Sequence, residues 1–202
     1  GKAYHTQGDL NLESVEFRGF QFSQIQGPYW ADNKQVLLGS YNALREGSQG
    51  RPIPAGERRL KAQVSGGMLV GDCQVVLEQP PRFLLQTSLS DGDLARYAGE
   101  MLAGRQKLKG RVNAYLLLGG TAAGSHTFKG HGRAVLQDAD IYELPVMVAL
   151  LKILSLRPPD TRAFSHSDLD FRIEGPYFYF DRIGFRGDAV SLRGNGTMNL
   201  DS

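Results

Sequence analysis

The stretch Asp168-Leu169-Asp170-Phe171-Arg172-Ile173-Glu174-Gly175 decides how this chain folds, because polar and apolar residues alternate in it strictly. Successive side chains of a β-strand point to opposite faces, so Leu169, Phe171 and Ile173 share one face. The alternation continues toward the C-terminus in Phe178 and Phe180, Ile183 and Phe185, Val190 and Leu192, and Met198 and Leu200. Breaks at Gly175, Asp181, Gly187-Asp188 and Asn195-Gly196 predict turns between short antiparallel strands.

The rest of the chain shows the same alternation, interrupted by one loop and two helical patterns. Three or more short strands are predicted within 8–39, and others over 60–64, 68–70, 73–77 and 83–86. A strand over Gly110–Leu118 places Val112, Ala114, Leu116 and Leu118 on one face. The polar, glycine-rich stretch 41–57 is predicted to be a loop, and Ser90-Asp91-Gly92-Asp93 caps a short helix over Leu94–Leu102. The sequence therefore predicts a mainly β protein with two short helices.

The second predicted helix is an apolar block, Leu144–Leu156. Leu144, Val148, Leu151 and Leu154 recur at helical spacing, Pro145 suits the first turn, and Pro158-Pro159 ends the pattern. The block has about 13 residues, short of the roughly 20 that a spanning helix needs. We expect it to pack on the sheet or cap one end of it.

Composition narrows the class of protein. The chain has 202 residues, a net charge of +2 without a basic run, 25 glycines and one cysteine. No disulfide or cysteine cluster can form within it, and nucleic acid is not an expected partner. The start, Gly1-Lys2-Ala3, has no methionine and no apolar run, so we expect a fragment of a longer protein. Residues 1–80 are predicted to be a β-rich repeat region continuous with a C-terminal β domain over 81–202.

No residue pattern indicates catalysis or metal binding. Gly130-His131-Gly132 lacks the further residues of a nucleotide-binding loop, and the four histidines are dispersed. Asp168 and Asp170 share a strand face, which permits a carboxylate pair for glycoside hydrolysis but is more simply a solvated face. Lys107, Lys109 and Arg111 share a face that suits lipid phosphates, with solvent exposure the simpler interpretation. We expect no enzyme activity, no cofactor and no metal.

From Phe83 to Leu200 the chain resembles the C-terminal domain of the AsmA and TamB superfamily of Gram-negative envelope proteins, which are related to bridge-like lipid transfer proteins. The resemblance rests on a succession of segments: 84–94, 108–114, 128–132, 135–141, Leu144-Pro145 with its apolar helix, Phe164, 170–175 and 192–196. It implies a long curled β-sheet with an apolar concave side, in a periplasmic protein tethered to the inner membrane. Such proteins are linked to phospholipid transport and outer-membrane integrity.

These observations together predict a non-enzymatic envelope domain that handles phospholipid between inner and outer membrane. The acyl chains would lie in a sheet groove, unless the sheet closes on itself as a core. The groove candidates are Val112, Leu116, Leu118, Phe171, Ile173, Phe178, Phe180, Ile183 and Phe185. An alternative is an assembly module that docks another envelope protein through its edge strands.

Overall fold

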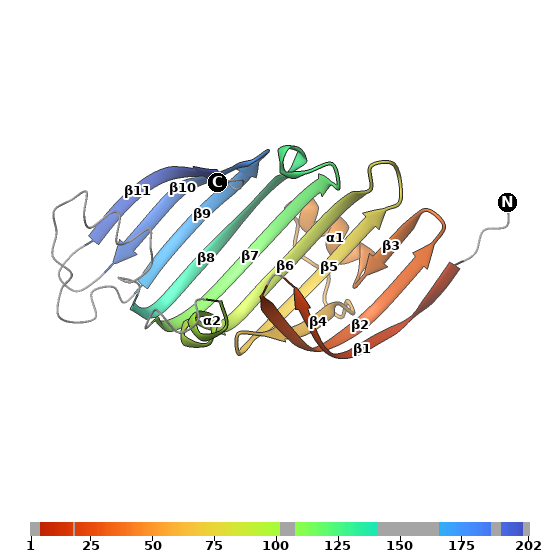
Figure 1. Cartoon of the computed structure of the whole chain (residues 1–202), viewed down its shortest axis with the longest axis horizontal. Helices are drawn as coiled ribbons and strands as arrows, with labels where there is room; N and C mark the ends of the chain where they lie inside the picture. The colour runs from red at the N-terminus through yellow and green to blue at the C-terminus, as the bar shows by residue number, and fades with distance from the viewer. Residues whose placement is uncertain (1–4, 18, 102–107, 141–165, 187–190, 200–202) are drawn as a thin grey trace.

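The computed structural model describes residues 5–17, 19–101, 108–140, 166–186 and 191–199. These residues form one eleven-stranded antiparallel sheet in the order β1-β2-β3-β5-β6-β7-β8-β9-β10-β11, with β4 paired to β2 and β5 (Figure 1). The strands are β1 (His5–Phe17), β2 (Phe20–Asp32), β3 (Gln35–Leu38), β4 (Leu60–Val64), β5 (Gly67–Val76), β6 (Arg82–Asp93), β7 (Lys109–Thr121), β8 (Lys129–Asp140), β9 (His166–Glu174), β10 (Tyr177–Arg186) and β11 (Ser191–Asn199). The predicted antiparallel meander is confirmed.

Many strands are longer than the sequence predicts, because several glycines lie inside strands rather than between them. The segments 68–70 and 73–77 are joined in the single strand β5, where Gly71 allows the backbone of β6 to approach: a Cβ there would lie 2.9 Å from the carbonyl oxygen of Gln86. Asp181 likewise lies within β10, and Asn195-Gly196 lies within β11. Beside Asp181 the pairing register shifts, but strand β10 continues. The breaks predicted at these positions are wrong.

Helix α1 (Tyr41–Ser48) forms in the stretch predicted to be a loop. Ser40 begins it by accepting a hydrogen bond from the backbone N–H of Ala43 at 3.1 Å, an N-cap that satisfies a helix donor. Ala43 and Leu44 are buried against the sheet. The eight residues of α1 include too few apolar ones to show a helical period in the sequence. The helix is therefore stabilised mainly by its packing on the sheet.

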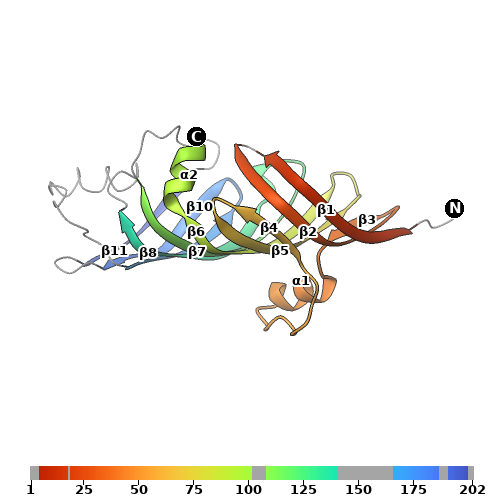
Figure 2. The ribbon, with the colours of Figure 1, turned by 90° about the horizontal axis from the view of Figure 1, so that it is seen from below.

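Helix α2 (Leu94–Met101) confirms the short helix predicted over Leu94–Leu102. Asp93 accepts hydrogen bonds from the backbone N–H groups of Ala95 and Arg96, as the predicted capping sequence requires. The two helices lie on opposite faces of the sheet, which curls so that the β1–β2 hairpin rises on the same side as α2 (Figure 2). We refer to these as the α2 face, which is concave, and the α1 face.

The hydrophobic core lies between α2 and the sheet. Its buried residues come from α2, from the residue before β7 and from strands β8 and β10: Leu94, Ala98, Leu108, Leu136, Ala139 and Phe185. This core covers one end of the α2 face only. The apolar helix predicted over Leu144–Leu156, with Leu144, Val148, Leu151 and Leu154, lies outside the described residues.

Candidate functional site

The α2 face carries three apolar rows that cross the sheet from β5 to β11 at right angles to the strands. The pairing register defines each row, because directly opposed residues point to the same face. The first contains Cys73, Leu85, Leu118, Gly130, Ile173, Phe178 and Met198; the second contains Gly71, Thr87, Leu116, Gly132, Phe171, Phe180 and Gly196; the third contains Leu69, Leu89, Ala114, Ala134, Leu169, Ile183 and Gly194. Apart from Thr87, no side chain in the rows carries a hydrogen-bonding oxygen or nitrogen.

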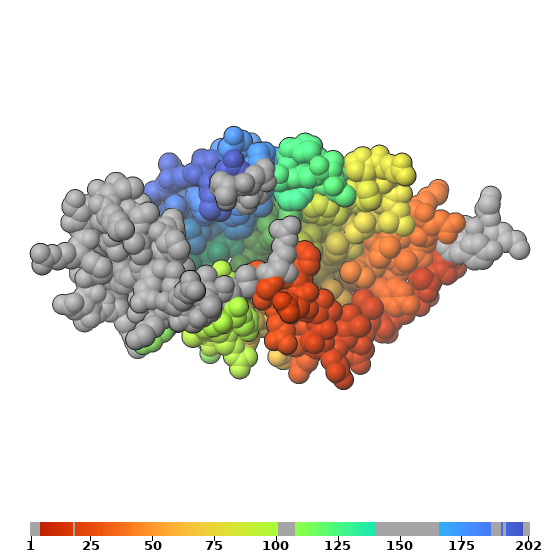
Figure 3. All heavy atoms as spheres, in the orientation of Figure 1, coloured from red at the N-terminus to blue at the C-terminus, as the bar shows by residue number. Residues whose placement is uncertain are grey.

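All nine groove candidates lie on this one face, but the structure divides them between a core and an open surface. Phe185 belongs to the buried cluster beneath α2, and Val112 and Ile183 pack against that cluster. Ile173 is also buried, whereas the others are only partly buried: Leu116, Leu118, Phe171, Phe178 and Phe180. The space-filling view shows a hollow between the β1–β2 hairpin and strands β8 to β10 (Figure 3). The described sheet is thus neither a closed barrel nor a wholly filled core.

Aromatic rings and glycines on neighbouring strands shape the surface of the first two rows. The ring of Phe171 lies against Gly132, where a Cβ would overlap it, and stacks on Phe178 with the ring centroids 4.5 Å apart. Phe178 in turn contacts Phe180 at 4.9 Å between centroids. Because the three rings contact one another along the sheet, they present a continuous apolar surface.

A separate apolar pocket lies where the β1–β2 hairpin meets α2. We call it the α2 pocket; its volume is about 370 Å³. Its walls come from β2, β4, the turn after β4, β5, β6, α2 and β7: Phe20, Phe22, Val64, Ser65, Leu69, Leu89, Gly92, Asp93, Leu94, Tyr97 and Val112. Phe20 stacks on Tyr97 with centroids 6.0 Å apart, which connects the hairpin to the helix. Of its wall residues, the sequence predicted only Val112 as a site residue.

On its C-terminal strands the α1 face carries a series of ion pairs. Arg182 lies 3.1 Å from Oδ2 of Asp168 and 2.7 Å from Oδ2 of Asp170, and Arg133 lies 3.6 Å from Asp170. The two aspartates share a face as predicted, but Asp168 is buried and not solvated, because its carboxylate fills the space beside Gly184. Both carboxylates are engaged by guanidinium groups, so the arrangement gives no support to a catalytic carboxylate pair.

The segment between β3 and β4 is fastened to the α1 face at both of its ends by one residue, Asp72. Its Oδ1 accepts a hydrogen bond from the backbone N–H of Ser40 at 2.8 Å, and its Oδ2 accepts one from Nε of Arg59 at 2.7 Å. Burial raises the pKa of the Asp72 carboxyl, and the Ser40 and Arg59 contacts oppose that rise. The segment is therefore a compact unit held against the sheet.

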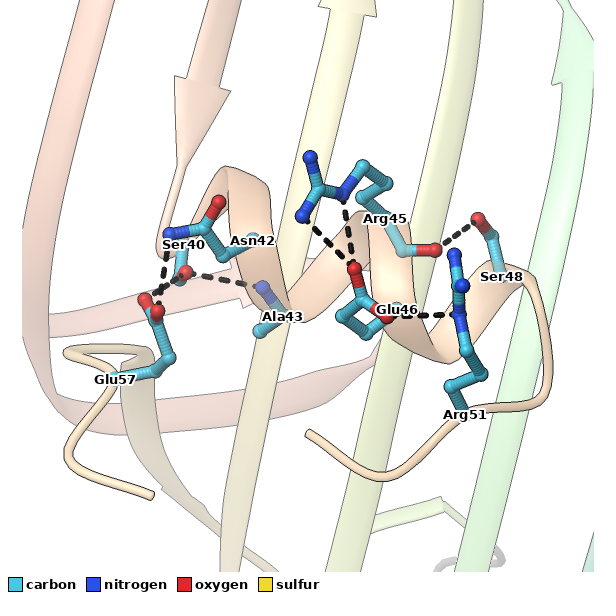
Figure 4. Close-up of polar contacts among 8 residues, drawn as sticks. All are labelled: Ser40, Asn42, Ala43, Arg45, Glu46, Ser48, Arg51 and Glu57. Carbon is cyan, nitrogen blue, oxygen red and sulfur yellow. Dashed lines mark hydrogen bonds and ion pairs between the residues drawn. The ribbon is translucent and has the colours of Figure 1, made fainter. Parts of the chain in front are cut away.

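Within the same segment, Glu57 joins the start of α1 to the chain before β4 through hydrogen bonds (Figure 4). Its carboxylate accepts from the Ser40 hydroxyl and from Nδ2 of Asn42, and these two bonds lower the pKa of the Glu57 carboxyl. At the other end of α1, Glu46 pairs with Arg45 at 2.9 Å and with Arg51 at 2.8 Å. This network accounts for the polar residues of the segment as structural contacts.

Two further observations concern metals and membranes. Among the described residues, no group of three or more His, Cys, Asp or Glu side chains has an arrangement that could hold a metal ion. None of the helices in the described ranges is both long enough and apolar enough to span a bilayer.

Comparison with known proteins gives no relative. No protein-family model, no curated protein and no solved structure matches the chain. The similarity to the AsmA and TamB superfamily rests on the sequence segments quoted above and stays a prediction.

Proposed function

We propose that this chain is a non-enzymatic lipid-handling domain of a bacterial envelope, which holds the acyl chains of phospholipids against the α2 face. The observation that carries the proposal is the set of three apolar rows across β5 to β11, partly exposed along one concave face. A monomeric soluble protein rarely exposes a large contiguous apolar patch, and such patches mark sites for apolar partners. The envelope location follows from the AsmA and TamB resemblance alone.

Hydrocarbon suits this face in chemistry and in strength of binding. Each methylene removed from water contributes about 0.8 kcal/mol, so about ten methylenes along one row contribute roughly 8 kcal/mol before the costs of association. Because the rows offer hardly any hydrogen-bonding partner, nothing fixes the lipid at one position along them. This permits movement along the groove, which transport requires.

Native mass spectrometry of protein purified from bacterial envelopes tests the proposal. We expect bound phospholipid, released as intact lipid on activation in the gas phase. Phe178→Asp places a charge in the first row and should reduce the bound lipid, while Tyr177→Asp on the next residue is the control, because its side chain lies on the opposite face. Lipid-free wild-type protein, or equal loss in both variants at equal melting temperature, would reject the proposal.

A second candidate function rests on strand β1. It forms one edge of the described sheet, and three of its apolar residues on the α2 face are well exposed: Leu12 at 42%, Val15 at 41% and Phe17 at 63%. A long exposed edge with apolar side chains favours pairing with an added strand. Cross-linking in envelopes tests this: a protein attached at Val15→Cys but not at Thr197→Cys, in a Cys73→Ser background, would support docking through β1.

A further inference from the structure

The α2 pocket differs from the open rows because it has a roof. The hairpin residue Phe20 and the helix residue Tyr97 come from distant parts of the chain and meet in a near-parallel stack, with an interplanar angle of 29°. Beneath this stack the floor is formed by strand residues on the α2 face, among them Leu69, Leu89 and Val112. The stack therefore forms an arch over one end of the apolar face.

Two of the three polar side chains in the pocket wall, those of Ser65 and Asp93, already have hydrogen-bond partners; the third is Tyr97. Ser65 donates its hydroxyl hydrogen to Oε2 of Glu100 at 2.9 Å, and its carbonyl oxygen accepts the backbone N–H of Asp93 at 2.8 Å. The Asp93 carboxylate caps α2 through Ala95 and Arg96. Because most of the wall is apolar, a polar ligand group buried here would lose hydrogen bonds to water with little replacement, which is unfavourable.

We propose that the α2 pocket is a seat for a single hydrocarbon chain, which enters from the open rows and passes beneath the Phe20–Tyr97 arch. This inference rests on the proposed function and makes it more specific: the lipid's acyl chain occupies the pocket and its polar head stays outside. The volume of about 370 Å³ lies within the range of small-molecule sites, at its lower end, and suits one chain. The third row leads into the pocket, because Leu69 and Leu89 belong to both.

The position of the hydrophobic core supports the direction of entry. Leu94 belongs both to the pocket wall and to the buried cluster under α2, so the core closes the pocket on that side. A chain that arrives along the rows consequently ends against α2. The pocket then sets the length of chain that fits completely.

Filling the pocket tests the inference with a matched control on the same strand. Leu89 and Leu85 are both on β6, on the same face and partly buried, but only Leu89 lines the pocket. Leu85 belongs to the first row, so Leu85→Trp measures the effect of a bulky ring in the open groove, against which the effect at the pocket is compared. Binding of hexadecanoic acid and dodecanoic acid is measured by calorimetry for the wild type, Leu89→Trp and Leu85→Trp. In Leu89→Trp we expect hexadecanoic acid to bind roughly tenfold more weakly, the effect of losing about two buried methylenes, with dodecanoic acid less affected.

The outcomes separate the two proposals. If the wild type binds neither fatty acid nor phospholipid, both the proposed function and this inference fail. If the wild type binds both fatty acids and Leu89→Trp behaves like Leu85→Trp, the pocket is not the seat and the groove function stands. Should Leu89→Trp not fold, Tyr97→Ala gives the same test: removal of the arch should weaken binding of the longer chain, and unchanged binding would overturn the inference.

Discussion

Arg59 lies with its Nη2 2.7 Å from Oδ2 of Asp72, in an ion pair whose side chains are 13% and 0% exposed. The pair joins the residue that precedes β4 to a residue in the middle of β5, and the same carboxylate holds Ser40 at the start of α1. Two carboxylate oxygens thereby fix both ends of one chain segment. Breaking a buried pair by removing one partner leaves the other charge without compensation, which is costly.

The variant Asp72→Ala should destabilise the protein strongly, because it leaves the Arg59 guanidinium buried and unpaired. We expect a loss of about 3–5 kcal/mol in the free energy of unfolding. Asp181→Ala is the control, since Asp181 pairs with Arg172 at 2.8 Å on an exposed site and should cost at most about 1 kcal/mol. Urea denaturation measures both, and similar losses in the two variants would contradict a clamping role for Asp72.

Glu57 makes the α1 segment sensitive to acid. Hydrogen bonds from Ser40 and Asn42 lower the pKa of Glu57 below its usual 4.5 in the folded state. The folded protein therefore binds fewer protons than the unfolded chain in the window below pH 4.5, so this contribution is complete above that pH and is lost as the pH falls. The protection factors of the α1 amides, which correct for the slower intrinsic exchange in acid, should fall on acidification through this window, and Glu57→Gln should remove most of that pH dependence.

The pKa of Asp72 is shifted in the opposite direction to that of Glu57, so the two residues should change stability with pH in opposite senses. Because burial raises its pKa above 3.8, the folded protein binds more protons than the unfolded chain just above that pH. Ionisation of Asp72 then lowers stability as the pH rises through the window. A pH titration of stability in Glu57→Gln should expose this negative slope, and a flat profile would show that the Ser40 and Arg59 contacts fully offset the burial.

Cys73 offers a direct report on occupancy of the groove, because it is the one cysteine in the chain and lies in the first apolar row. Burial raises the pKa of its thiol, so less of the reactive thiolate is present and its reaction with a disulfide reagent should be slower than that of glutathione. Incubation with phosphatidylethanolamine and phosphatidylglycerol vesicles should slow it further. Thr197→Cys in a Cys73→Ser background lies on the opposite face and should show no protection; equal rates for Cys73 with and without lipid would argue against an occupied groove.

The period of two in the sequence predicted the strand faces well. Leu169, Phe171 and Ile173 share a face as expected, because one buried face fixes the register of a strand against slippage. Strand ends were predicted poorly, since a glycine such as Gly71 reads as a turn while in the sheet it makes room for the neighbouring strand. The close approach at Gly71 involves Gln86 of the neighbouring strand β6, and the residues next to Gly71 in the sequence do not indicate it.

The sequence also could not separate the core from the open surface. Phe178 and Phe185 have the same pattern around them, yet only Phe185 lies under α2. The sequence did not predict the α2 pocket for a related reason. Phe20 and Tyr97 are far apart in the sequence, and the residues around each of them do not indicate that the two rings come into contact. Such pairs depend on the curl of the whole sheet.

This division between core and open surface predicts different effects for two phenylalanines on β10. Phe185→Ala removes a ring that is 5% exposed and leaves a cavity beneath α2, so it should cost about 3–5 kcal/mol of stability. Phe178→Ala removes a partly exposed ring from the first row, so it should cost less stability and reduce the phospholipid retained by the purified protein. Denaturant titration and native mass spectrometry on the same samples measure the two effects. If Phe178→Ala proves as destabilising as Phe185→Ala while the bound lipid per folded molecule is unchanged, the open part of the α2 face is core and not groove.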